Sequence, residues 1–171
     1  MKKTKGFTLT EMLIYISVSS IAILAIASFV LWVNRSNTKI KVLKEVLNNS
    51  KSAIETMSYE IKHAKSIYIP TSIFSTHPGQ LSLETPSYAQ KDEYISYIDF
   101  FICEQSLCLK KENQDPIILT SDKVQVKNLE FNQVDTSSVQ INLKIDYLAP
   151  SDKPEYQASI NTTSTVSIRI Y

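Results

Sequence analysis

Glycine and histidine are both scarce in this chain of 171 residues. Only Gly6 and Gly79 occur, which argues against the glycine-rich loops that cradle phosphates. His63 and His77 are the only histidines, and no metal-ligand spacing, nucleophile motif or cofactor fingerprint accompanies them. The net charge is only +1, so no overall field attracts nucleic acid or an acidic substrate. We therefore expect no enzyme, no cofactor, no metal site and no nucleic-acid partner.

Proline and glycine are absent between Phe7 and Ile69. These residues are the usual causes of helix kinks, so the sequence predicts one unbroken helix from about Thr8 to Ile67, roughly 90 Å long. Residues 12–34 carry no charge, and 23 helical residues span roughly 34 Å against a hydrocarbon core of roughly 30 Å. Trp32 near the end of this run suits a membrane interface. The run is therefore interpreted as a retained membrane span and not as a cleaved secretory signal.

Beyond Trp32 the expected helix becomes amphipathic. Its apolar residues are predicted to form one stripe, comprising Ile40, Leu43, Val46, Leu47, Ile54, Met57, Ile61, Ala64 and Tyr68. Charged residues lie on the opposite side, including the i,i+4 pair Lys51 and Glu55. Ser50 interrupts the stripe, which is also wider than a coiled-coil seam. We expect the stripe to pack on a sheet formed by the rest of the chain.

After Pro70 the residue pattern favours β-strands. Apolar alternation with one buried face is typical of an antiparallel sheet, and it is clearest at residues 139–147. A change of parity between Val126 and Leu129 predicts a β-bulge. The other expected strands are 94–103, 107–111, 117–120, 124–132 and 166–170, with a turn at 151–154. The predicted fold class is α+β, a long helix packed on a C-terminal antiparallel head.

Two cysteines, Cys103 and Cys108, enclose four residues between strand-like runs. A four-residue hairpin loop would place them opposite each other, where a disulfide is geometrically feasible. Free thiols are the alternative, and a metal site ranks third because too few other ligands exist. A local disulfide is favoured about two to one over free thiols.

The first residues carry a recognisable signature. Lys2, Lys3 and Lys5 precede Gly6 and Phe7, Glu11 follows, and the apolar run begins directly after it. This combination resembles the class III leader and N-terminal helix of type IV prepilins and pseudopilins. The order of helix and strands is similar to minor pilins of the PilW type and to J-type minor pseudopilins of type II secretion. That wider likeness is only architectural.

The resemblance implies how the N-terminus is processed. A prepilin peptidase would cut between Gly6 and Phe7 and methylate the new amino group of Phe7. In that family the Glu11 carboxylate meets the terminal amine of a neighbouring subunit, which offsets the cost of a charge near hydrocarbon. The ordinary alternative is a glutamate favoured by the helix dipole and exposed to lipid headgroups.

The same resemblance implies a domain organisation and a set of partners. A leader at 1–6 would precede a membrane and assembly helix at 7–34, an amphipathic continuation at 35–69 and a β-rich head at 70–171. The partners would be the prepilin peptidase, other major and minor pilins or pseudopilins, the inner-membrane assembly platform and the lipid bilayer. The protein would cross the inner membrane once, with the head outside the cytoplasm, before it enters a pilus or pseudopilus. The flanking charges alone do not fix this orientation.

Two functions from different classes follow. The favoured one is a minor pilin or pseudopilin that initiates or primes assembly at or near the tip of a filament. Since many major pilins have a proline in the apolar helix, its absence here favours a minor subunit. The alternative is a single-pass membrane protein whose extracytoplasmic β-rich head binds a ligand or acts as a sensor.

Overall fold

The computed structural model describes residues 6–88 and 94–169. Lys2, Lys3 and Lys5 of the expected leader, and the end of the last expected strand, lie outside these residues. The chain separates into two compact units, of which the first ends at Thr38 and the second begins at Lys39. Helix α1 (Leu9–His63) contains residues of both units, and the predicted absence of an interruption is confirmed.

The strands and short 3-10 helices follow α1. They are β1 (Ser66–Ile67), η1 (Ile69–Thr71), β2 (Leu81–Thr85), β3 (Ser96–Cys103), β4 (Ser106–Lys111), β5 (Ile117–Ile118), β6 (Val124–Gln133), β7 (Ser138–Tyr147), η2 (Pro154–Tyr156) and β8 (Ser159–Ser167). The predicted α+β architecture is confirmed.

The first unit consists mainly of the apolar beginning of α1. This stretch is long and apolar enough to cross a membrane, and none of it is buried by the described residues. The hydroxyl groups of Ser17, Ser20 and Ser28 each donate to the carbonyl group four residues earlier, at 2.8 to 2.9 Å. Such bonds satisfy hydroxyl groups in an apolar environment such as a membrane. The unit therefore has the properties of a membrane anchor.

In the second unit, α1 packs its inner face on the sheets. The buried helix residues are Val42, Val46, Ser50, Ala53, Met57, Glu60 and Ile61. The predicted stripe is therefore partly wrong, because Ile40, Leu43 and Leu47 remain about half exposed. Ser50 does not interrupt the packing, since it is 1% exposed and shares a 2.7 Å hydrogen bond with Thr162 of β8.

Helix α1 ends four residues before the predicted position. Ser66 and Ile67 leave the helix because they pair with Glu84 and Leu83 of β2. The backbone N–H of Lys65 also donates to the carbonyl of Glu84, at 2.7 Å. A tertiary strand pairing therefore overrides the local helical pattern.

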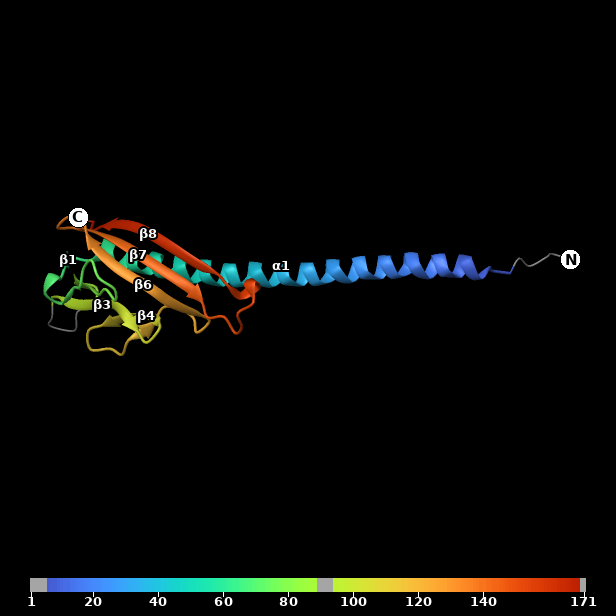
Figure 1. The fold of residues 1–171 in the computed structure, drawn as a ribbon. Coiled ribbons are helices and arrows are strands. Elements are labelled where there is room, and N and C mark those ends of the chain that lie inside the picture. Colours follow the sequence, from blue (N-terminus) through green and yellow to red (C-terminus); the bar gives the residue numbers. More distant parts are fainter. Residues whose placement is uncertain (1–5, 89–93, 170–171) are drawn as a thin grey trace. The chain divides into compact units, whose positions relative to one another are not determined.

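Two antiparallel sheets form the head. One has the order β1-β2-β3-β4-β5 and the other the order β6-β7-β8, and Figure 1 shows β8 at one margin of the second sheet. Both sheets contribute to one hydrophobic core with the inner face of α1. Its largest fully buried side chains are Phe100, Phe131, Met57, Ile61, Leu81, Leu83, Ile98, Leu107, Leu129, Ile141, Leu143 and Ile145.

In the second sheet, the sequence pattern predicted the buried face of β7 and the bulge in β6. Val139, Ile141, Leu143 and Ile145 of β7 are all fully buried. The register between β6 and β7 shifts between Val126 and Asn128, so the predicted bulge is confirmed. The expected turn at 151–154 leads into η2. Strand β8 starts at Ser159, earlier than expected, because its Ser- and Thr-rich first half also pairs with β7.

Strand β2 was not predicted, because its alternation is short and lies in a proline-containing segment. Gly79, just before it, donates its backbone N–H to the carbonyl of Leu129 at 2.9 Å. A Cβ atom on Gly79 would lie only 3.1 Å from that oxygen and 3.2 Å from the ring of Phe131. Gly79 therefore allows this segment to approach β6 closely, because it has no Cβ atom.

Candidate functional site

Thr8 caps the N-terminus of α1. Its hydroxyl oxygen accepts the backbone N–H of Glu11 at 3.3 Å, and its carbonyl accepts the N–H of Met12 at 3.2 Å. A threonine cap of this kind satisfies one of the free N–H groups in the first helical turn. The residues Thr8-Leu9-Thr10-Glu11 match the S/T-x-x-E capping pattern, so a signal for this cap is present in the sequence.

Glu11 lies in the first turn of α1 and is partly exposed. A complete capping box would also require its carboxylate to accept the N–H of Thr8, and no such bond forms. Within residues 6–88 and 94–169, no hydrogen bond or ion pair engages this carboxylate. The helix dipole favours the negative charge of Glu11 at this position.

Gly6 and Phe7 precede the helix in non-helical backbone. The Phe7 side chain is 69% exposed and touches Tyr15 edge-on, with ring centroids 6.2 Å apart. Nothing lies within 4 Å of a Cβ placed on Gly6. Together with Thr8 and Glu11, these two residues line an open hollow of about 500 Å³. The peptide bond between Gly6 and Phe7 is therefore exposed and free of helical hydrogen bonds, as a peptidase substrate must be. Cleavage and methylation there remain predictions.

The two cysteines lie on a tighter hairpin than predicted. Ser106 and Leu107 belong to β4, and Leu107 is fully buried, so only Glu104 and Gln105 form the turn. Cys108 is therefore opposite Phe101 and not opposite Cys103. Cys103 and Cys108 are nevertheless joined by a disulfide, with their Cα atoms 5.9 Å apart, because they lie diagonally across the two strands. The redox state in the cell remains a prediction.

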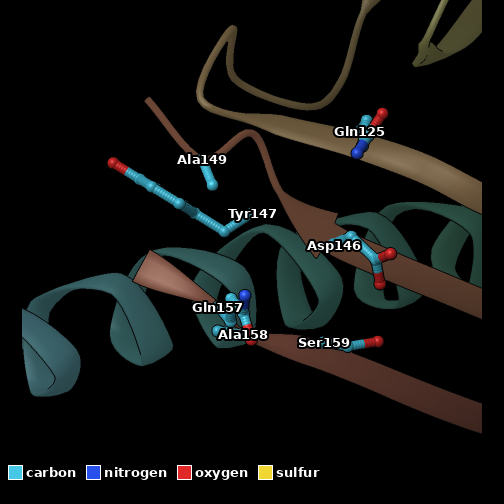
Figure 2. Close-up of a pocket in the computed structure, with 7 residues that line it drawn as sticks. All are labelled: Gln125, Asp146, Tyr147, Ala149, Gln157, Ala158 and Ser159. Atoms are coloured by element: carbon cyan, nitrogen blue, oxygen red, sulfur yellow. The ribbon is translucent and has the colours of Figure 1, made fainter. Parts of the chain in front are cut away.

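A second hollow lies on the three-stranded sheet. Its volume is about 280 Å³, and Figure 2 shows Gln125, Asp146 and Ser159 along its lining. These three come from β6, β7 and β8, and the other lining residues are Tyr147, Ala149, Gln157 and Ala158. One carboxylate oxygen of Asp146 is buried without a hydrogen-bond partner. None of the other described residues that line this hollow is a base or a cation.

The histidines are engaged in local contacts. His63 stacks on Tyr59 with ring centroids 4.3 Å apart. The Nδ1 atom of His77 accepts the backbone N–H of Leu129 at 3.1 Å. Among the residues that the structure describes, no three His, Cys, Asp or Glu side chains are grouped so that they could hold a metal ion.

Two ionisable groups join elements of the head. The hydroxyl of Ser66 donates to Glu84, and this bond lowers the pKa of the Glu84 carboxyl, with Lys65 acting in the same direction. Burial raises the pKa of Tyr88, and the carboxylate of Glu60, which accepts the hydroxyl hydrogen bond at 2.8 Å, acts in the same direction, so that the pKa is about 12. These groups stabilise the head and are not part of the site at residues 6–11.

Comparison with known proteins yields one match. Residues 1–27 match the family model described as the prokaryotic N-terminal methylation motif. No curated protein and no solved structure matches the chain. The matched region contains Gly6, Phe7 and Glu11. The match supports a type IV pilin-like or pseudopilin precursor, and it indicates a structural subunit that is processed by a prepilin peptidase and anchored in the membrane.

Proposed function

We propose that this protein is a minor type IV pilin or pseudopilin. It is made as a precursor, cut between Gly6 and Phe7, and methylated on the amino group of Phe7. The mature subunit then enters a pilus or a type II secretion pseudopilus at or near the tip, where it initiates or primes assembly. The observation that carries this proposal is the Glu11 carboxylate at the start of an exposed apolar helix, a carboxylate that has no hydrogen-bond or ion-pair partner within residues 6–88 and 94–169.

The position of Glu11 explains why an acid is tolerated there. In the membrane, the helix dipole and the headgroup region stabilise the charge at moderate cost. Cleavage creates a new amine on Phe7, and a neighbouring subunit can present that amine to Glu11. Because the apolar surroundings have a low dielectric, the ion pair is stronger there than in water. The pair would therefore select subunits that have been cleaved.

The exposed apolar surface of residues 12–34 supports the same function. No described residue of the chain covers this surface, so lipid surrounds it before assembly and neighbouring helices would surround it afterwards. The absence of proline and glycine from α1 favours a minor subunit over a major one. The single pass across the inner membrane, with the head outside the cytoplasm, belongs to the same proposal.

Analysis of the N-terminal peptide from the native host tests this function. We expect the mature chain to begin at methylated Phe7, and we expect Gly6→Leu to block cleavage because a large side chain replaces the small residue at the cut. A variant at the other glycine, Gly79→Ala, provides the control, since it should be cleaved normally. An intact Met1 in a host with an active prepilin peptidase would contradict the proposal and favour a membrane-anchored sensor.

A further inference from the structure

The sheet that covers α1 is narrower than the apolar face of the helix. Ile40, Leu43 and Leu47 are about half exposed, and Ile54 is only partly buried. Their spacing of three, four and seven residues places them along one flank of α1. Ser50 lies between this flank and the buried face, and it bonds to Thr162 of β8. The uncovered flank therefore runs alongside β8, the last strand of its sheet.

Along the middle of β8 the backbone edge on this side is open among the described residues, whereas just beyond the strand the N–H of Arg169 donates to the carbonyl of Lys62 of α1 at 3.2 Å. The N–H of Tyr147 donates to the carbonyl of Ala158, and the N–H of Ile168 donates to that of Ser137. These two bonds show that the even-numbered residues of β8 point their backbone groups toward β7. The odd-numbered residues point theirs outward, and for Asn161, Thr163 and Thr165 no backbone partner exists among the residues that the structure describes.

A hollow connects the free edge to the uncovered flank. It has a volume of about 330 Å³. Its lining consists of Leu47, Ser50, Lys51, Ile54, Glu55 and Thr162. The Nζ atom of Lys51 and the Oε1 atom of Glu55 lie 3.8 Å apart at its rim, and their charges neutralise each other. The hollow therefore favours neither a positively nor a negatively charged partner. The edge itself has no proline, lysine or bulge along its nine residues, although such features normally protect edge strands from pairing.

We propose that this edge binds a β-strand of another polypeptide, which pairs with β8 as a fourth strand of the sheet. The strand carries apolar residues at alternate positions, which enter the hollow and cover Leu47 and Ile54. The other side chains of the added strand are polar, because they lie on the same face as the exposed side chains of Asn161, Thr163 and Thr165 of β8. Backbone hydrogen bonds supply the affinity and the alternate apolar residues supply the specificity.

A second copy of this chain does not fit as the occupant. Among the described residues, strands β1 and β5 are only two residues long. The inward side chains of β8, which include Thr162 and Val166, already face the helix of their own chain. None of these strands can place alternate apolar residues into the hollow of a neighbour. Lipid does not fit either, because acyl chains cannot bond to the free N–H and C=O groups.

Amide hydrogen exchange tests the proposal on the detergent-solubilised full chain. The probe is a synthetic nine-residue peptide of alternating valine and threonine, and a serine and threonine peptide of equal length is the control. We expect the amides of Asn161, Thr163 and Thr165 to exchange rapidly in the free protein. The valine-containing peptide should slow them about tenfold at ten times its dissociation constant, while the control peptide has no effect.

Variants distinguish the edge from general peptide binding. Leu47→Lys places a charge in the hollow and should abolish the protection, whereas Ile117→Lys, at a similarly half-exposed residue of the other sheet, should not. Thr163→Pro removes an outward N–H that does not bond to β7, and this variant should also abolish the protection by the peptide. The proposal is overturned if the edge amides are already protected from exchange without peptide, including by self-association. It is also overturned if the valine-containing peptide does not slow their exchange, or if Leu47→Lys and Thr163→Pro both leave the protection unchanged.

Discussion

Replacing Tyr88 with phenylalanine removes the hydroxyl that joins the segment after β2 to helix α1. The hydroxyl donates to the Glu60 carboxylate at 2.8 Å, and Glu60 is only 7% exposed. The ammonium of Lys111 lies 3.9 Å from the ring centroid, but phenylalanine retains a ring at that position. The variant therefore leaves a buried carboxylate without its hydrogen bond while it preserves most of the packing.

A hydrogen bond to a charged group contributes about 1.5–3 kcal/mol to the free energy of unfolding, and this range gives the magnitude. Burial, together with the Glu60 carboxylate, raises the pKa of Tyr88 from 10.0 to about 12, so the hydroxyl keeps its proton and can donate this bond at neutral pH. We therefore expect Tyr88→Phe to lower the free energy of unfolding by about 2 kcal/mol at neutral pH. Because the folded-state pKa is raised, the contribution of Tyr88 is complete below pH 10 and is lost as the pH rises through about 12.

Chemical unfolding of the detergent-solubilised full chain, followed by circular dichroism, measures this difference. Tyr94→Phe is the matched control, since the Tyr94 side chain is 90% exposed, and it should unfold like the unmodified protein. Titration of tyrosinate absorbance should show a group with a pKa of about 12 that is missing in Tyr88→Phe. Equal stability of Tyr88→Phe and Tyr94→Phe at neutral pH, or ordinary titration of Tyr88, would refute the argument.

Three further predictions concern the head. Gly79→Ala should lower the free energy of unfolding by about 1–3 kcal/mol, because its Cβ would crowd the carbonyl of Leu129; unchanged chemical unfolding would show that the loop moves away freely. Glu84→Gln should be less stable than the unmodified protein at neutral pH, and the difference should shrink as the pH falls below 4.5 through the lowered pKa of Glu84. A difference independent of pH would exclude this role. Non-reducing peptide mapping of protein from the native host should recover Cys103 and Cys108 as a disulfide, whereas free thiols at both positions would show that the bond does not form there.

The sequence predicted those features that depend on local pattern. The unbroken helix followed from the absence of proline and glycine, and the strand at 139–147 followed from alternation of apolar residues. The bulge in β6 was visible as a change of parity near Val126. Each of these signals is a pattern of the contiguous sequence, so no knowledge of tertiary contacts was needed.

Features that depend on distant partners could not be predicted in the same way. Ser50 is buried because Thr162, 112 residues later, completes its hydrogen bond. The end of α1 depends on the pairing of Ser66 with Glu84. The register of the cysteines depends on the burial of Leu107. At the N-terminus, the sequence singled out Gly6, Phe7 and Glu11 as candidates, whereas the absence of a partner for the Glu11 carboxylate within residues 6–88 and 94–169 required coordinates.

The assembly role of Glu11 is the central claim, and the abundance of Glu11 variants in filaments tests it most directly. Glu11→Ala and the isosteric Glu11→Gln should be cleaved normally, because neither changes Gly6 or Phe7. Both should be depleted in purified filaments at least about tenfold relative to the unmodified protein, since a charge pair in an apolar setting contributes more than about 1.4 kcal/mol. Glu55→Gln, an exposed glutamate on the same helix, should be incorporated normally. Normal incorporation of Glu11→Gln and Glu11→Ala would contradict the account.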